Sequence, residues 1–300
     1  MRPLEFSAPG SLDEAIKLLS GSAGPVGVLG GGTDLIIQYR GGRKELGHMV
    51  DVKKIPELNV LSFDAKAGLR LGAAVSCMSL GEFKSAVQHY PGLVEGAELI
   101  GSTQIQSRAT VGGNVCNGSP AADSICGLIV HNGVCVVQGP KGKREIQAAQ
   151  MMTGPGKTAL QPGEFLERIR IPLDPSWRFA TCKITKRQDQ DISAVAAGFA
   201  VRLDGQGRVA EARLAYGGMA ATPKRASHAE AALTGRPWSL DGVTAARAAL
   251  ERDFQPLTDM RAGAGYRQLV AGNLLLRFYL ETTGQETPGQ GAPVKEANHG

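Results

Sequence analysis

The chain has 300 residues, of which 42% are hydrophobic and 20% charged, with a net charge of +5 and a pI of about 9.0. This length allows one large domain or two ordinary ones, with a core that needs neither disulfides nor a structural metal. The basic residues are scattered and no basic run is interleaved with aromatic side chains, which argues against a nucleic-acid-binding protein.

The first stretch predicts a small α/β unit. Ser11 and Glu14 have the spacing of a capping box, which marks the start of a helix. The predicted order is helix 12–19, strand 26–29, glycine turn 30–32, helix 33–39 and strand 48–52. We interpret residues 1–55 as a nucleotide-holding lobe.

A second lobe is predicted from residue 56 to residue 173. Ser79 and Glu82 repeat the capping-box spacing and predict a helix that runs to about Gln88. The other elements predicted here are strands 59–63, 69–75, 133–138 and 168–171 and helix 93–100.

The succession of predicted helices and strands is interrupted near Pro172 and Pro175, which predicts a separate domain over residues 174–283. Its predicted elements are strands 194–203 and 209–216, followed by helices 224–233, 240–252 and 262–281. Strands followed by helices indicate the α+β class. Residues 284–300, rich in Gly, Pro and polar residues, are expected to be disordered.

The first candidate site follows strand 26–29. It consists of Val28, Leu29, Gly30, Gly31, Gly32, Thr33, Asp34 and Leu35. Consecutive glycines before a helix expose backbone N–H groups that bind anions. The spacing is not that of the dinucleotide fingerprint, which needs glycine in place of Leu35. A plain glycine turn capped by Thr33 or Asp34 is the alternative.

The second candidate site is a glycine segment about 80 residues later. Thr110 supplies a hydroxyl before Gly112 and Gly113, and Asn114 follows them. Further on, Asp123 supplies a carboxylate for a ribityl or ribose hydroxyl. A surface turn with a satisfied polar loop is the alternative for this segment taken alone. We interpret the two segments together as a grip on a diphosphate.

Other chemistry finds little support in the sequence. Residues 156–158 resemble the end of a P-loop, but that motif needs glycine in place of Met151. Neither the histidines nor the five cysteines have the spacing of a metal site, so we predict no metal. No nucleophilic triad is evident, and we predict no catalytic residue in this chain. With no signal peptide, no apolar run of 18 residues and no C-x-x-C pair, we expect a cytoplasmic protein without a membrane span.

The two glycine segments resemble those of the FAD-binding medium subunit of the molybdenum hydroxylases, the xanthine dehydrogenase and carbon monoxide dehydrogenase family. The likeness extends from Leu4 to about Thr283. It rests on four segments in order: Gly-Gly-Gly-Thr-Asp-Leu at 30–35, Ala-Thr-Val-Gly-Gly-Asn at 109–114 with Ser-Pro-Ala-Ala-Asp at 119–123, residues 183–195, and residues 214–220.

The resemblance implies a fold and a set of cofactor contacts. The fold is a two-lobed FAD-binding domain, PCMH-type and vanillyl-alcohol-oxidase-like, followed by a small α+β C-terminal domain. Residues 28–35 would wrap the diphosphate, and Thr110, Gly113 and Asn114 would form its other side. Asp123 would hydrogen-bond the cofactor. Apolar contacts and a cation would come from Ile100, Leu166 and Lys183.

The resemblance also implies partners. Single-chain relatives carry iron–sulfur and molybdopterin domains around this region, so we expect one subunit of three. A small [2Fe-2S] subunit and a large molybdopterin subunit would accompany it, in a dimer of heterotrimers. The large subunit would hydroxylate an N-heterocycle or purine with oxygen from water, and electrons would pass through [2Fe-2S] centres to FAD and an acceptor. Carbon monoxide or an aldehyde as substrate, and NAD, quinone or oxygen as acceptor, stay open.

Two other function classes stay open from the sequence. A stand-alone flavin oxidoreductase with its own substrate pocket would turn over a donor without partner chains. A non-catalytic nucleotide-binding or assembly module would purify colourless and resist reconstitution with flavin.

Overall fold

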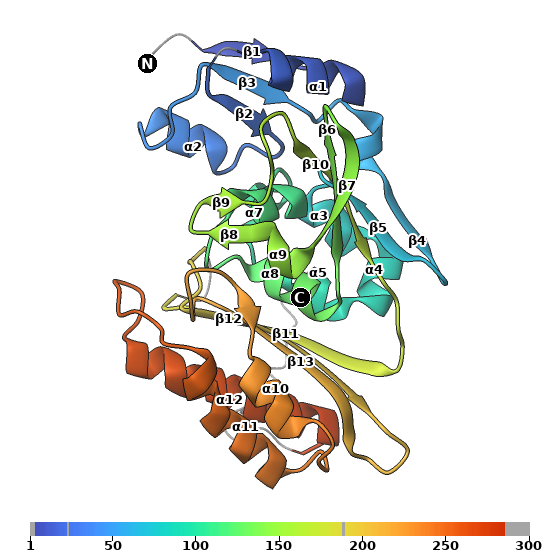
Figure 1. Cartoon of the computed structure of the whole chain (residues 1–300), viewed down its shortest axis with the longest axis vertical. Coiled ribbons are helices and arrows are strands. Elements are labelled where there is room, and N and C mark those ends of the chain that lie inside the picture. The colour runs from blue at the N-terminus through green and yellow to red at the C-terminus, as the bar shows by residue number, and fades with distance from the viewer. Residues whose placement is uncertain (1–3, 23, 188–189, 286–300) are drawn as a thin grey trace, which may run out of the picture.

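The computed structural model describes residues 4–22, 24–187 and 190–285, in three parts stacked from the N- to the C-terminal end of the chain (Figure 1). The first part is a parallel three-stranded sheet in the order β1-β3-β2 with two helices. Its elements are β1 (Glu5–Ser7), α1 (Leu12–Gly21), β2 (Val26–Leu29), α2 (Leu35–Arg40) and β3 (His48–Asp51).

The predicted start of α1 is confirmed. The Ser11 hydroxyl accepts a hydrogen bond from the Glu14 N–H at 3.3 Å, and the Glu14 carboxylate accepts one from the Gly10 N–H at 2.8 Å. Strand β2 has the predicted bounds, whereas α2 begins two residues later than expected, at Leu35.

The second part is an antiparallel five-stranded sheet in the order β4-β5-β10-β6-β7, with helices on one side (Figure 1). Its strands are β4 (Leu61–Asp64), β5 (Gly68–Gly72), β6 (Val134–Gly139), β7 (Gly142–Gln147) and β10 (Phe165–Ile171). Its helices are η1 (Pro56–Asn59), α3 (Cys77–Glu82), α4 (Lys84–His89), α5 (Pro91–Glu98), α6 (Thr103–Gln106), α7 (Val111–Asn117), α8 (Asp123–Val130) and α9 (Ala148–Met151). A short hairpin of β8 (Met152–Gly154) and β9 (Lys157–Thr158) completes it.

The predicted capping box at Ser79 and Glu82 is wrong. Ser76 is the N-cap of α3, and its hydroxyl accepts a hydrogen bond from the Ser79 N–H at 3.0 Å. The helix also ends at Glu82 and restarts at Lys84, because Phe83 has an extended backbone conformation.

The third part is an antiparallel sheet in the order β11-β12-β13-β14 with three helices. Its elements are β11 (Trp177–Ile184), β12 (Val195–Leu203), β13 (Val209–Gly217), β14 (Lys224–Arg225), α10 (Ser227–Leu233), α11 (Leu240–Asp253) and α12 (Ala264–Thr283). The expected disordered segment, 284–300, lies outside the described residues beyond Gln285.

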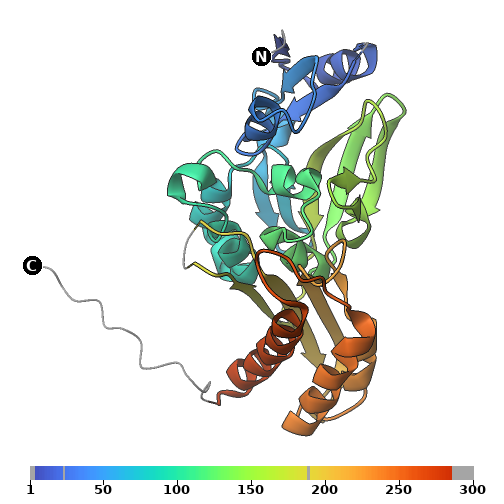
Figure 2. The ribbon, with the colours of Figure 1, turned by 90° about the vertical axis from the view of Figure 1, so that its left-hand side faces the viewer.

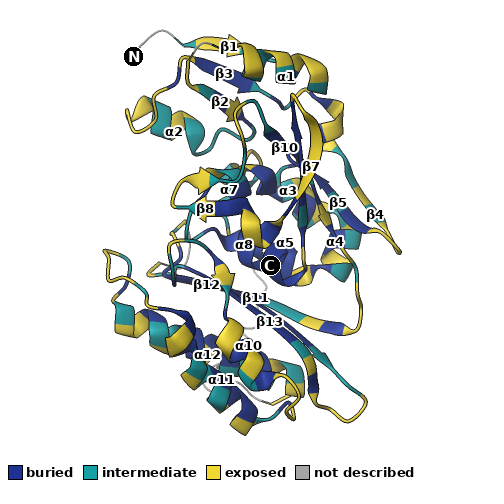
Figure 3. Ribbon diagram, in the orientation of Figure 1, coloured by how far each residue is buried: buried dark blue, intermediate teal, exposed yellow. Residues whose placement is uncertain are grey.

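This third sheet is covered on both faces. Helices α5 and α8 of the second part pack on one face, and α10 to α12 cover the other (Figure 2). Every residue of α8 is buried (Figure 3). Gly198 in β12 allows this contact, since a Cβ there would lie 2.6 Å from the Cys126 carbonyl carbon. The close packing fixes the start of α8, and therefore Asp123, between two parts of the chain.

Within the described residues, no helix combines the length and the apolar character needed to cross a bilayer.

Candidate functional site

The two glycine segments, far apart in sequence, meet in the structure. A Cβ built on Gly31 would lie 2.8 Å from the Ala109 Cα, and one on Gly30 would lie 3.3 Å from the Thr110 hydroxyl oxygen. Contact this close between the segments requires a residue without a side chain at Gly31. The pocket at their junction is lined by Val28, Gly30, Gly31, Gly32, Thr33, Asp34, Leu35, Lys44, Ile100, Ala109, Thr110, Gly113, Asn114, Cys116 and Asn117.

The first segment offers unpaired donors to this pocket. Within the part of the chain that the structure describes, the backbone N–H groups of residues 31–34 have no hydrogen-bond acceptor. Gly32 has a φ of +78°, a left-handed conformation that glycine adopts at little cost. Successive unpaired N–H groups around a concave turn suit an anion such as a diphosphate.

The second segment forms the start of helix α7, an element that the sequence did not predict. Thr110 is the N-cap of α7, and its hydroxyl accepts a hydrogen bond from the Gly113 N–H at 2.8 Å. The Asn114 side-chain oxygen accepts one from the Ser124 hydroxyl at 2.7 Å. The Asn114 amide NH₂ and the Thr110 hydroxyl hydrogen have no acceptor among the described residues. Both are therefore free to donate to a ligand in the pocket.

Sequence reasoning missed the polar side chains that hold this pocket together. The Lys53 ammonium donates to the Gly30 carbonyl at 3.0 Å and pairs with Asp51 at 2.8 Å. Gln38 bridges the two lobes, because its amide NH₂ donates to Asp34 at 2.5 Å and to Asn117 at 3.2 Å. In the sequence, the one feature that pointed to a contact between Lys53 and the glycine turn is that Lys53 follows closely on the end of β3.

Asp123 and Lys183 form a buried ion pair. The Lys183 ammonium lies 2.8 Å from the Asp123 carboxylate, and their side chains are 8% and 12% exposed. The Ser193 hydroxyl donates to the same carboxylate. Burial raises the pKa of Asp123, and this outweighs the opposing effect of the Lys183 charge.

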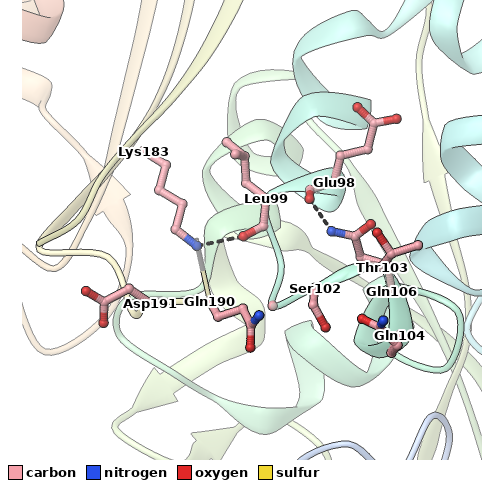
Figure 4. A pocket seen from close by; sticks show the side chains of 10 residues that line it. Glu98, Leu99, Ser102, Thr103, Gln104, Gln106, Lys183, Gln190 and Asp191 are labelled. Carbon is pink, nitrogen blue, oxygen red and sulfur yellow. Dashed lines mark hydrogen bonds between the residues drawn. The ribbon is translucent and has the colours of Figure 1, made fainter. Parts of the chain in front are cut away.

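Lys183 also lines a second pocket, which Figure 4 shows from close by. Its ammonium donates to the Leu99 carbonyl at 2.7 Å. Other lining residues come from the α5–α6 connection and from the end of the β11–β12 connection, including Ser102 and Asp191. Leu99 precedes Ile100, so the two pockets adjoin at this point of the chain.

Most predicted site residues line one of these pockets, and the exceptions are two leucines and Asp123. Leu29 is 5% exposed and Leu166 is 4% exposed, and both belong to hydrophobic core clusters. Leu166 pairs with Val137 in the central sheet. A contact from Leu166 to a ligand therefore stays a prediction.

Four of the thiols are buried and Cys116 is partly buried, and none is poised for chemistry. Burial raises the pKa of Cys77, Cys116, Cys135 and Cys182 to about 12, so these groups are protonated at neutral pH. The described residues include no group of three or more His, Cys, Asp or Glu side chains that could hold a metal ion.

Two family profiles match the chain in order. The profile described as "FAD binding domain in molybdopterin dehydrogenase" matches residues 2–174. The profile described as "CO dehydrogenase flavoprotein C-terminal domain" matches residues 180–282.

Individual proteins match over nearly the full length. The xanthine dehydrogenase FAD-binding subunit of Escherichia coli O157:H7 is 32% identical over 86% of this chain and 88% of its own. The carbon monoxide dehydrogenase medium chain of Hydrogenophaga pseudoflava is 27% identical over 91% of this chain and 94% of its own. A solved carbon monoxide dehydrogenase from Oligotropha carboxidovorans superposes with a TM-score of 0.87 and 28% identity, covering 94% of this chain and 98% of that one.

Proposed function

Because the chain belongs to the FAD-binding subunits of the molybdenum hydroxylases, the family of xanthine dehydrogenase and carbon monoxide dehydrogenase, we propose that it is an electron-transfer subunit. It would take electrons from [2Fe-2S] clusters of a partner chain and pass them through FAD to an external acceptor. We propose no catalytic acid or base in this chain. FAD supplies the redox chemistry when bound, and the protein supplies position and electrostatics.

The contact between the two glycine segments is the observation that carries this proposal. Unpaired N–H groups of residues 31–34 lie on one side of the pocket, and the Thr110 hydroxyl and Asn114 amide lie on the other. Donors on both sides match a diphosphate, which presents acceptor oxygens in several directions. The Lys53 ammonium, bonded to the Gly30 carbonyl, would hold the turn in its binding conformation.

The remaining site residues would hold other parts of the cofactor. Ile100 lines the pocket and would supply an apolar contact, and we propose the same for Leu166 through a shift from its core position. Lys183, which lines the second pocket, would hydrogen-bond cofactor hydroxyls or phosphates there, and we propose that its partner Asp123, which lines neither pocket, also hydrogen-bonds the cofactor. The low exposure of both groups would keep their orientation fixed.

Partners and substrate follow from the proposed role. A small [2Fe-2S] subunit and a large molybdopterin subunit would complete a heterotrimer, which would pair into a dimer of heterotrimers. Hydroxylation of an N-heterocycle or purine on the large subunit is supported by the relative named xanthine dehydrogenase. We also propose a cytoplasmic location, an FAD-binding domain over residues 1–173 with lobes 1–55 and 56–173, and a C-terminal domain over residues 174–283.

Purification of the tagged chain from its source tests the proposal. We expect a coloured complex with about one FAD per chain, and with iron and molybdenum on chains that co-purify. A colourless chain that fails to take up FAD would contradict the proposal. So would turnover of an electron donor by this chain without any partner.

A further inference from the structure

An apolar patch is exposed at the start of α12 and on the loop before it. We define the α12 patch as Ile192, Leu257, Met260, Tyr266 and Leu269, whose exposed fractions are 50%, 82%, 82%, 51% and 60%. Single exposed apolar residues are ordinary, but a contiguous group of them marks an interaction site. The loop that carries Leu257 and Met260 projects at the left edge of the molecule in Figure 1, and Figure 3 shows exposed residues along it.

The residues of the α12 patch come from two segments that lie side by side. The Lys186 ammonium, in the β11–β12 connection, donates to the Met260 carbonyl at 2.7 Å. Ile192 and Met260 line one small hollow, and Ile192 and Leu257 line another. Tyr266 and Leu269 are three positions apart in α12, so they share one face of the helix.

The patch is held in place by a buried arginine. Arg267, 3% exposed, donates to the Ala194 and Gly218 carbonyls and pairs with Asp259 at 2.7 Å. The Ala264 N–H donates to the Thr258 hydroxyl at 3.0 Å, which joins the loop to the first turn of α12. The apolar side chains are therefore displayed by a braced loop, and binding would cost little ordering entropy.

The rim of the patch is basic. Among its described residues, three cations with exposed or half-exposed side chains, Lys186, Arg187 and Arg261, lie near two carboxylates, Asp191 and Asp259. Arg187 is 70% exposed and lies 3.8 Å from Asp191, a weak pair. An apolar centre with a basic rim fits a protein surface with an apolar centre and acidic side chains around it.

The patch borders the cofactor site. Leu257 and Ile192 share their hollow with Ser193, which donates to Asp123, and with Ser119, two residues after Asn117 of the glycine pocket. A partner seated on the patch would lie against the wall of the site that we assign to FAD. Electron transfer requires such closeness between donor and acceptor groups.

We propose that the α12 patch is the docking surface for the iron–sulfur subunit, which would present a complementary apolar surface with an acidic rim. This inference rests on the proposed function. Beyond that function, it identifies the surface of this chain to which the electron-donating subunit would bind.

The test uses the complex purified through a tag on this chain. The double variant Leu257→Asp/Met260→Asp places carboxylates at the centre of the patch, and Leu240→Asp, at a position 52% exposed at the start of α11, is the matched control. We expect the double variant to retain its FAD while the iron recovered per FAD falls about tenfold or more, because an unpaired charge in an apolar interface is costly. The control should keep both. Lys186→Glu should slow association with the iron–sulfur chain, most strongly at low salt.

Three results would overturn the inference. The first is unchanged iron per FAD in the double variant. The second is loss of molybdenum with iron retained, which would assign the patch to the large subunit. The third is a wild-type dimer of this chain alone that the double variant converts to a monomer, which would assign the patch to a second copy. Failure of the proposed function gives a different result, since the wild-type complex would then lack FAD or iron.

Discussion

At the scale of single residues, Gly31 is the position in the glycine pocket where a side chain would fit least well. The resemblance in sequence implied that Gly31, with the rest of residues 28–35, would wrap the diphosphate. The structure shows that a Cβ on Gly31 would first meet the Arg108 carbonyl oxygen and then the Ala109 Cα, 2.8 Å away. The residue therefore sets the distance between the two segments, a fact that depends on tertiary contact and is absent from the local pattern.

We expect Gly31→Val to lower FAD affinity about tenfold or more, because the two segments would separate and their donors would no longer converge. Gly113→Val should act in the same direction, since its Cβ would lie 2.9 Å from the Thr110 hydroxyl oxygen that caps α7. Titration of the flavin-free chain with FAD measures the effect. Gly205→Val, at a turn with nothing within 4 Å of the added Cβ, is the control and should bind as the wild type does.

The sequence predicted Asp123 and Lys183 as separate cofactor contacts, and the structure shows them as partners. Removal of one partner leaves a buried charge unpaired, which costs about 3–5 kcal/mol. We expect Asp123→Asn and Lys183→Met each to lower the free energy of unfolding, and the double variant to be more stable than the sum of the single effects implies. Urea unfolding of the four proteins gives the coupling, and additive effects would contradict the pairing.

His131 makes the fold sensitive to acid. It is 5% exposed and stacks on Phe179 with ring centroids 3.8 Å apart. Burial, with a smaller effect from Arg213, lowers its pKa from 6.5 to about 3. The unfolded chain then binds a proton below pH 6.5 that the folded chain does not bind until about pH 3, so stability falls as pH falls through this window.

The expected loss is about 1.4 kcal/mol per pH unit below 6.5, or about 2 kcal/mol at pH 5. His131→Phe keeps an aromatic ring against Phe179 and removes the titrating group. Denaturant unfolding at pH 7 and pH 5 should therefore show a smaller acid loss in this variant. Equal losses in the two proteins would mean that His131 is charged in the folded state.

At the scale of elements, the sequence correctly predicted helices and strands in which apolar residues recur with a regular period. Strand β2 and helices α11 and α12 have bounds close to the predicted ones. Helix α7 was missed because Gly112 and Gly113 disfavour helix, and only the cap from Thr110 and tertiary contact offset this cost. Strand β7 was missed because five of its six residues are exposed and mostly polar, as an edge strand allows.

The corrected cap of α3 can be tested by substitution. We expect Ser76→Ala to lower the free energy of unfolding by about 1 kcal/mol, because the Ser79 N–H loses its acceptor. Glu82→Ala should have almost no effect, since Glu82 is exposed and no capping bond to it is present among the described residues. Thermal unfolding of both variants separates the two assignments, and a larger cost at Glu82 would restore the original one.

At the scale of the whole molecule, the site is produced by the stacking of parts. The glycine pocket lies between the first and second parts, and the Asp123–Lys183 pair joins the second part to the third. The sequence predicted that the two segments belong to one ligand, because a diphosphate has two sides to hold. It could not predict that Gln38 bridges the first and second parts through Asn117, since this depends on how the parts pack against each other. Nor could it predict that Lys53 bonds to the Gly30 carbonyl within the first part.

Hydrogen exchange on the flavin-free chain, with and without FAD, tests the central claim most directly. The N–H groups of residues 31–34 have no acceptor in the described part of the protein, so they should exchange rapidly without ligand. Addition of FAD should slow exchange in peptides that cover residues 30–35 and 110–114, and leave the turn at residues 204–207 unchanged. Saturating FAD that protects other segments and leaves both glycine segments fast would contradict the account.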